Sequence, residues 1–121
     1  MSALRHHDDL FRYGPESQAE PVARGIKQVL LGADDCVMQA KTWYARGAVT
    51  EPKANASTLV CYVLDGFFEI HIDGKTQILG PSGSFIVPAR TMYEMTCLEE
   101  GVLLGVFAAQ NESAFVPEAL R

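Results

Sequence analysis

The chain has 121 residues and a mass of 13.2 kDa, which is the size of a single domain. Hydrophobic residues make up 48% of it and charged residues 21%, and this globular composition excludes a disordered or collagen-like chain. Fifteen Asp and Glu against ten Lys and Arg leave a formal charge of −5, and no basic stretch stands out. We therefore expect neither nucleic acid nor a membrane surface as a partner.

The N-terminal residues lack the apolar core of a secretory signal, and no apolar run is long enough to cross a bilayer. Cys36, Cys61 and Cys97 are odd in number and far apart, which speaks against a disulfide framework or a zinc knuckle. We expect a cytoplasmic protein whose three cysteines are buried free thiols.

The chain divides into three parts. Residues 1–25 are polar and interrupted by glycine and proline, which predicts an N-terminal arm. Residues 26–110 alternate short β-branched and aromatic runs with Gly, Asp and Pro, without helical periodicity, and predict one β domain. We expect residues 111–121 to be a C-terminal tail. The predicted strands are 26–31, 36–45, 59–64, 67–72, 76–79, 84–87, 92–98 and 102–108.

Two Asp-Gly dipeptides, Asp65-Gly66 and Asp73-Gly74, are the strongest turn signals, because a type I′ turn needs positive φ at both central positions. We expect an antiparallel hairpin at each of them. About eight short strands at this spacing predict an all-β sandwich or barrel.

The spacing of the turn residues resembles that of the cupin superfamily, which consists of small jelly-roll barrels. The first cupin motif reads G, five residues, H-x-H, three or four residues, E, six residues, G. The second motif reads G, five residues, P-x-G, two residues, H, three residues, N. The first motif falls on Gly47, Lys53, Asn55, Leu59 and Gly66, and the second on Ser82, Pro88, Arg90, Tyr93 and Cys97.

This resemblance implies a cupin-type double-stranded β-helix, a jelly-roll barrel of the single-domain, RmlC-like kind. The general sequence pattern most resembles that of small cupins of the pectin-degradation type. We carry over the fold of those proteins and not their activity. Small cupins form homodimers, often with one subunit's N-terminal segment crossing to the other. Leu10, Phe11 and Tyr13 suit such a crossing arm, because an apolar cluster on a polar segment needs a surface to cover it.

A cupin metal is held by three imidazoles and one carboxylate. The corresponding positions here offer the ammonium of Lys53, the amide of Asn55, the alkyl group of Leu59 and the phenol of Tyr93. A lysine in this place would repel a divalent cation by several kcal/mol at ~4 Å. We therefore expect no metal and no cofactor, although a metal cupin with displaced ligands is a third possibility.

The three histidines do not restore a metal site. His6 and His7 lie in the arm, and neighbours on an extended chain point to opposite sides. His71 differs in parity from Phe68 and Ile70, so it faces away if they face the core.

Alternation along the strands predicts which side chains face the interior: Lys53, Asn55, Ser57, Leu59, Cys61, Val63, Phe68, Ile70, Ile72, Tyr93, Met95 and Cys97. Strand 36–45 has two registers: either Met38, Ala40, Thr42 and Tyr44 face inward, or Gln39, Lys41 and Trp43 do. The second is favoured, because an amphipathic aromatic such as the single tryptophan is a common ligand platform at a barrel mouth. The predicted ligand-binding residues are Asn55, Leu59, Lys41, Trp43, Cys61, Phe68 and Met95.

Two functions compete for this interior. In the first, a metal-independent cupin binds a small oxygenated or anionic metabolite. Lys53 and Tyr93 are its candidate catalytic residues for isomerisation, cyclisation or another proton transfer, because a tyrosine beside a cation ionises more easily. In the alternative, a non-catalytic effector-sensing or assembly protein has a vestigial pocket filled by side chains. An open cavity of several hundred Å³ favours the first function.

Overall fold

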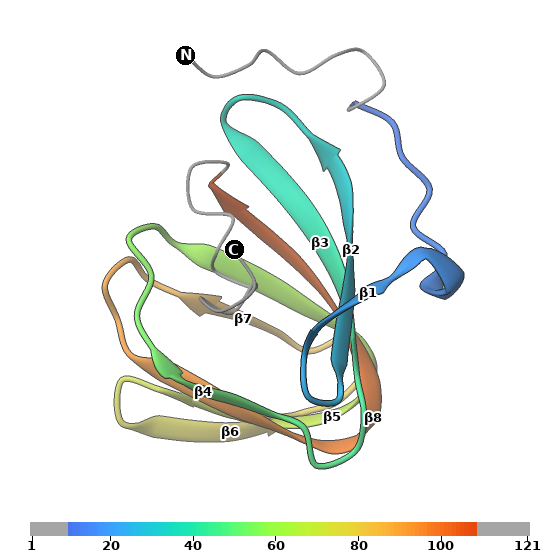
Figure 1. The fold of residues 1–121 in the computed structure, drawn as a ribbon. Coiled ribbons are helices and arrows are strands. Elements are labelled where there is room, and N and C mark those ends of the chain that lie inside the picture. The colour runs from blue at the N-terminus through green and yellow to red at the C-terminus, as the bar shows by residue number, and fades with distance from the viewer. Residues whose placement is uncertain (1–9, 109–121) are drawn as a thin grey trace.

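The structure is a computed structural model that describes residues 10–108, and within them it forms eight strands and one short 3₁₀ turn (Figure 1). The predicted all-β jelly roll is confirmed. No helix among the described residues is long and apolar enough to span a membrane. The elements are η2 (Glu16–Gln18), β1 (Glu20–Ala23), β2 (Ile26–Ala33), β3 (Val37–Tyr44), β4 (Val49–Lys53), β5 (Leu59–Ile72), β6 (Lys75–Leu79), β7 (Ser84–Val87) and β8 (Tyr93–Ala108).

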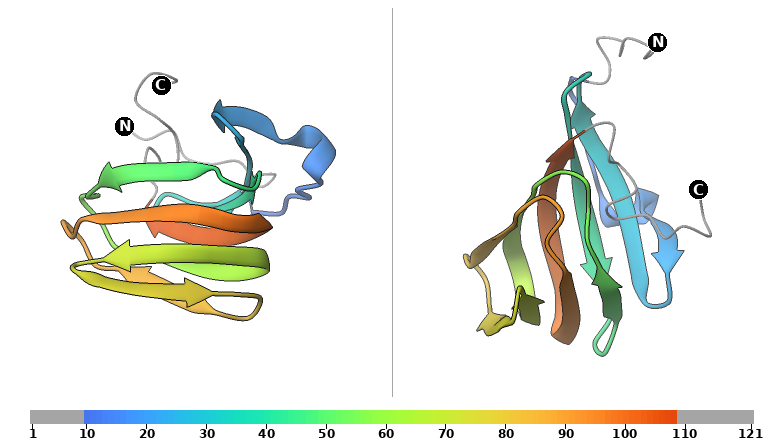
Figure 2. Two further views of the ribbon diagram at one scale, coloured as in Figure 1. Left: turned by 90° about the horizontal axis from the view of Figure 1, so that it is seen from below. Right: turned by 90° about the vertical axis from the view of Figure 1, so that its left-hand side faces the viewer.

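One antiparallel sheet bends into two layers because β5 and β8 run through both. The first half of β5 and the second half of β8 lie in a layer with β1, β2, β3 and β7. The second half of β5 and the first half of β8 lie in the other layer, in the order β4, β8, β5, β6 (Figure 2, left). In Figure 1 the layers meet where β5 and β8 bend and diverge to the left.

The predicted hairpin at Asp65-Gly66 is wrong. Strand β5 continues through it, and the register against β8 shifts between Val63 and Phe68. Strand β8 likewise continues through the break between the predicted strands 92–98 and 102–108. Gly66 has φ +82°, and this left-handed backbone conformation forms part of a β-bulge and not of a turn. An Asp-Gly pair signals positive φ in both situations, and only the strand that lies opposite decides between them.

The hairpin at Asp73-Gly74 is confirmed. It joins β5 to β6, and both residues have positive φ (50° and 82°), as a type I′ turn requires. The structure has eight strands, as predicted, but several of their boundaries differ from the predicted ones. Two pairs of predicted strands merge into β5 and β8, whereas β1 and β4 were missed because their sequences are polar and contain proline.

The core lies between the layers and follows the predicted alternation in β5 and β8. Leu59, Cys61, Val63, Phe68 and Ile70 are buried, as are Tyr93, Met95 and Cys97 of β8. The outward position expected for His71 is also confirmed. It lies opposite Glu94 of β8, and its Nδ1 contacts Oγ1 of Thr76.

The favoured register of β3 is wrong. Met38, Ala40, Thr42 and Tyr44 are buried, and Gln39, Lys41 and Trp43 face outward. Both candidate sets mix polar and apolar residues, so alternation alone could not choose between them. The structure satisfies the inward Thr42 with a hydrogen bond from Gln28 Nε2 to its Oγ1 (3.2 Å), whereas the alternative register would bury the ammonium of Lys41.

The described part of the predicted arm packs on β2. Glu16 forms an ion pair with Lys27 (3.0 Å), and Gly14 lies against Val29 and Leu31. Three residues of this arm, Leu10, Phe11 and Tyr13, are exposed. Cys36 is exposed as well, which corrects the expectation of three buried thiols; Cys61 and Cys97 are buried. His6, His7 and the predicted tail lie outside the described residues.

Candidate ligand-binding site

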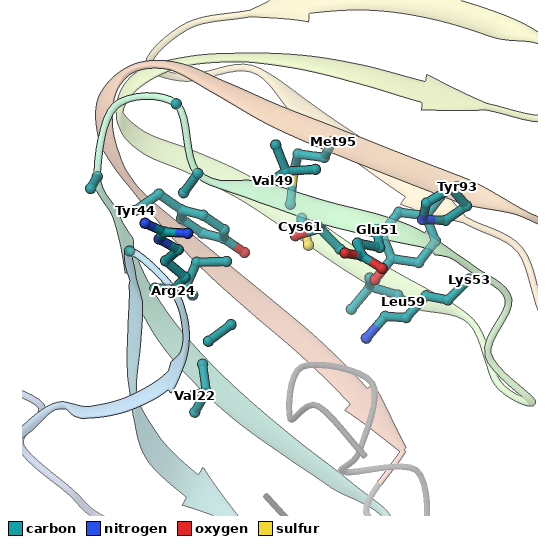
Figure 3. Close-up of a pocket in the computed structure, with 18 of the residues that line it drawn as sticks. Val22, Arg24, Tyr44, Val49, Glu51, Lys53, Leu59, Cys61, Tyr93 and Met95 are labelled. Atoms are coloured by element: carbon teal, nitrogen blue, oxygen red, sulfur yellow. The ribbon is translucent and has the colours of Figure 1, made fainter. Parts of the chain in front are cut away.

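The two layers enclose a cavity of about 930 Å³ that is partly open to solvent. Strands β4, β5 and β8 form one part of its wall, and the β1–β2 turn with the residues that follow β3 forms another (Figure 3). This volume is in the range of ~300–1,000 Å³ that is usual for small-molecule sites. Six of the predicted site residues line the cavity: Lys53, Asn55, Leu59, Cys61, Tyr93 and Met95.

The four positions that align with the cupin metal ligands meet on one wall of the cavity. Lys53 ends β4 and lies opposite Tyr93, the first residue of β8. Leu59 begins β5, and Asn55 lies in the loop between β4 and β5. The backbone N–H of Arg90 donates to the Asn55 carbonyl (2.6 Å), which ties this loop to the one before β8.

The residues at these positions do not fit a cupin metal centre. An ammonium, a carboxamide and a leucine side chain replace two imidazoles and the carboxylate, and a phenol replaces the third imidazole. Within residues 10–108, no three His, Cys, Asp or Glu side chains gather closely enough to hold a metal ion. The four aligned positions instead offer an amide, a phenol and a cation.

Burial controls the ionisation of Tyr93. It raises the pKa of the hydroxyl well above the ordinary value of 10, the Asn55 side chain opposes this increase, and the nearby Cys61 thiol adds to it. The expected lowering of the Tyr93 pKa is therefore wrong, because loss of hydration outweighs any charge effect at this position. The phenol remains protonated at neutral pH, where it donates a hydrogen bond.

The Asn55 side chain is buried, with only 9% of its surface exposed. Its Nδ2 has no hydrogen-bond partner at acceptable geometry among residues 10–108, although the amide lies near enough to Tyr93 to influence its pKa. A buried donor without an acceptor costs about 1–3 kcal/mol. Asn55 therefore brings to the cavity wall a donor that an acceptor from a ligand or water could satisfy.

Tyr44, the last residue of β3, brings a second phenol to the cavity (Figure 3). Burial raises its pKa, the neighbouring Cys61 and Tyr93 raise it further, and a hydrogen bond with the Thr50 side chain opposes them. The Tyr44 ring packs edge-on against Phe68, with centroids 5.2 Å apart. Phe68 was a predicted ligand contact, but it lies in the core and does not line the cavity.

Lys41 and Trp43 were also predicted to contact the ligand, and the structure places them elsewhere. Both lie on the outward face of β3, and neither lines the cavity. The Lys41 ammonium lies 5.2 Å from the centroid of the Trp43 ring, a cation–π arrangement. Their displacement follows directly from the register of β3.

Several residues of the cavity wall were not predicted from the sequence to lie there. Arg24 lies in the β1–β2 turn, Arg46 in the turn after β3, and Glu51 in β4. Tyr44 belongs to the register that was considered and not favoured. No local signal marks Arg24, because it reaches the cavity only through the pairing of β1 with β2.

No protein-family profile matches the chain. The pectin degradation protein KdgF of Dickeya dadantii is 30% identical over 98 residues, which are 79% of this chain and 89% of that protein. The structure of KdgF from a Halomonas species has a TM-score of 0.77 at 26% identity, covering 81% of this chain and 91% of the other. The structure of an RmlC-like cupin from Shewanella frigidimarina has a TM-score of 0.78 at 28% identity, covering 87% of this chain and 92% of the other.

The chain therefore belongs to the cupin superfamily, among the small RmlC-like cupins related to KdgF. This relationship and the cavity together define a small-molecule-binding cupin.

Proposed function

We propose that this cupin binds a small oxygenated anion without a metal, in the cavity between its layers. The observation that carries the proposal is the convergence of Lys53, Asn55 and Tyr93 on one wall of the cavity, where Asn55 Nδ2 has no partner among the described residues. In the proposed complex a ligand oxygen accepts from Asn55, and another accepts from the protonated Tyr93 hydroxyl. The hydrogen bond to Nδ2 offsets the cost of burying that donor.

The charges around the cavity favour an anion. Although the whole chain carries a formal charge of −5, residues 10–108 contribute three cationic side chains, Arg24, Arg46 and Lys53, and one carboxylate, Glu51, to the cavity wall. A cationic cleft in an acidic protein concentrates anions locally. The relationship to a pectin degradation protein points the same way, because pectin consists largely of galacturonic acid, a sugar that carries a carboxylate.

The proposed independence from metals rests on the chemistry of the four aligned side chains. Leu59 supplies no lone pair, and the ammonium of Lys53 opposes a cation. In our proposal the Lys53 ammonium attracts the negative charge of the ligand, as a metal cation would in a metal-dependent cupin.

A proton transfer on the ligand is the chemistry that these groups support best. Tyr93 keeps its proton at neutral pH, so it acts as a general acid toward a ligand oxygen and not as a base. In the proposed step the Glu51 carboxylate on the cavity wall accepts the proton that leaves the ligand carbon, while Tyr93 protonates the carbonyl oxygen. Lys53 stabilises the negative charge that develops on that ligand. The open cavity favours this function over the vestigial pocket of a non-catalytic module.

Ligand binding is tested by thermal unfolding of the protein with galacturonate and, as the neutral counterpart, galactose. A hundredfold excess over Kd stabilises by about 2.7 kcal/mol, which raises Tm by about 10 °C. We expect an increase with the sugar acid that Lys53→Ala removes and that Lys41→Ala retains, because Lys41 lies outside the cavity. Equal responses to acid and neutral sugar, or equal effects of the two lysine variants, would contradict an anion site at Lys53.

The metal question is tested separately, on protein purified without a histidine tag. Elemental analysis should find far less than one transition metal per chain, and a chelator should leave the thermal shift unchanged. One equivalent of bound metal would refute the metal-independent part of the proposal while leaving ligand binding intact.

Proton transfer is tested by NMR in D₂O with keto and aldehyde sugar acids. We expect deuterium to enter at the carbon next to the carbonyl group, and Tyr93→Phe to slow this exchange at least tenfold while the sugar acid still binds. Exchange at the wild-type rate in Tyr93→Phe would remove Tyr93 from the chemistry.

A further inference from the structure

The cationic side chains of the cavity wall belong to two separate places. Lys53 ends β4, and Arg24 and Arg46 belong to two turns near the beginning of that strand. Strand β4 spans about 13 Å from Val49 to Lys53, at ~3.3 Å per residue. Figure 3 shows Arg24 beside Tyr44 and Lys53 at the other end of the drawn wall. A single carboxylate therefore does not contact both places in this arrangement.

The two turns that carry the arginines are held against each other. The backbone N–H of Ala45, next to Arg46, donates to the carbonyl of Gly25, next to Arg24 (2.8 Å). The second turn is also fixed to β8, because the N–H of Gly47 donates to a carbonyl of that strand (2.8 Å). Both arginine side chains therefore start from fixed backbone at the same edge of the cavity. We call Arg24 and Arg46 the arginine edge.

The arginine edge is available to a ligand. Within residues 10–108, neither of its side chains forms an ion pair, in contrast to Lys27, which pairs with Glu16. A guanidinium group presents parallel N–H donors that match the two oxygens of a carboxylate. Two such groups on adjoining turns, both lining the cavity, form a suitable cradle for one anionic group.

The cavity wall between the arginine edge and Lys53 has a different character. Glu51 lies on β4 between the two cationic places, so the order along the wall is cation, carboxylate, cation. The side chains of Val49, Cys61 and Met95 lie between those of Tyr44 and Tyr93 (Figure 3). This order favours a ligand with negative charge at both ends, because a negative group in its middle would meet Glu51.

The size of the cavity agrees with a ligand of this length. Its volume of about 930 Å³ is near the upper end of the ~300–1,000 Å³ that small-molecule sites occupy. A single sugar acid at Lys53 leaves the arginine edge without an anion. Two linked sugar acids supply a second carboxylate and a longer body.

We propose that the arginine edge is a second carboxylate subsite, and that the cavity takes a dicarboxylate built from two linked sugar acids. This inference rests on the proposed function, because it assigns the first carboxylate to the Lys53 end. In the proposed complex one carboxylate binds at Lys53, the second accepts hydrogen bonds from Arg24 and Arg46, and the sugar rings pass the apolar wall between them.

The test is calorimetric titration of the full-length protein with three ligands: digalacturonate, galacturonate, and lactobionate, a disaccharide acid with one carboxylate. We expect digalacturonate to bind at least tenfold more tightly than either of the others. Lactobionate separates the second charge from the added length. Lactobionate binding as tight as that of digalacturonate would overturn the proposal, because length alone would then explain the gain.

Variants of the arginine edge locate the second carboxylate. Arg24→Ala and Arg46→Ala should each lower the affinity ratio of digalacturonate to galacturonate at least threefold, and the double variant should bring it near one. The matched control is Lys75→Ala, which removes a cation from the exposed surface of β6 outside the cavity and should keep the full ratio. The single variants decide the question if the circular dichroism spectrum shows that the double variant does not fold.

The outcomes separate this inference from the proposed function. Equal binding of digalacturonate and galacturonate by the wild type would overturn the second subsite and leave the site at Lys53 standing. An affinity ratio that survives in the folded arginine variants, or that Lys75→Ala lowers equally, would overturn it as well. Galacturonate binding that Lys53→Ala leaves unchanged contradicts the proposed function instead, and binding of none of the three ligands would overturn both.

Discussion

A Cβ atom added to Gly66 would lie 2.4 Å from the Cα of Gly101, so β5 and β8 touch backbone to backbone where they bend. The contact is mutual, because a Cβ on Gly101 would lie 2.4 Å from the carbonyl oxygen of Asp65. Two glycines therefore permit both long strands to pass from one layer into the other. This bend brings the first residue of β8, Tyr93, to the same cavity as Tyr44 of the opposite layer.

Gly66→Ala should destabilise the fold severely, by about 3 kcal/mol or more, because strain at positive φ and the contact with rigid backbone add together. Gly74→Ala is the matched control: its φ is also +82°, but a Cβ there meets nothing within 4 Å. The control should cost only about 1–2 kcal/mol. Urea unfolding measures both, and equal losses would show that the close contact has no energetic consequence.

Asn55→Leu should separate stability from binding. The substitution removes a buried donor that has no partner among residues 10–108, so the free energy of unfolding should stay unchanged or rise by up to about 1 kcal/mol. Binding of a sugar acid should fall by at least tenfold, measured by calorimetry. A large loss of stability with unchanged affinity would make Asn55 a structural residue and not a ligand contact.

Stability should fall with rising pH above about 9. Burial raises the pKa of the Cys61 thiol from 9.0 to about 12, so between these values the unfolded chain has lost a proton that the folded chain keeps. The free energy of unfolding then decreases by about 1.4 kcal/mol per pH unit for this group. Burial also raises the pKa values of Tyr44 and Tyr93, which steepen the decrease above pH 10.

This dependence is measured by urea unfolding at several pH values between 8 and 11. Cys61→Ala should retain the contributions of the two tyrosines and of Cys97, whose pKa burial also raises, and should lose the Cys61 share of the decrease that begins near pH 9. An identical slope in the variant would show that the thiol does not titrate as its burial implies.

The three cysteines should differ strongly in their reaction with a thiol reagent at pH 8. Cys36 is exposed and should react within minutes. Cys61 and Cys97 should react only as the protein opens, because burial raises the pKa of each and keeps the reagent out. Counting released chromophore over time checks this, and a fast phase of more than one thiol per chain would contradict it.

Much of the fold could be predicted from local sequence. Alternation in β5 and β8 gave the inward residues from Leu59 to Cys97, because side chains on a strand change face at every residue whatever lies opposite. The spacing of the cupin motifs likewise anticipated that Lys53, Asn55, Leu59 and Tyr93 would line one cavity. The alternation of side chains along a strand and the spacing of turn residues are local, so they can be read from neighbouring residues.

Only the tertiary structure decided the bulge at Gly66, the register of β3 and the place of Arg24 on the cavity wall. Each depends on a strand that is distant in sequence: β8 lies opposite Gly66, β2 pairs with β3 and satisfies Thr42, and β1 carries the chain to Arg24. A glycine with positive φ fits a turn as well as a bulge, and a strand with polar and apolar residues on both faces can turn either face inward. The packing partner selects among them, and the local sequence does not name that partner.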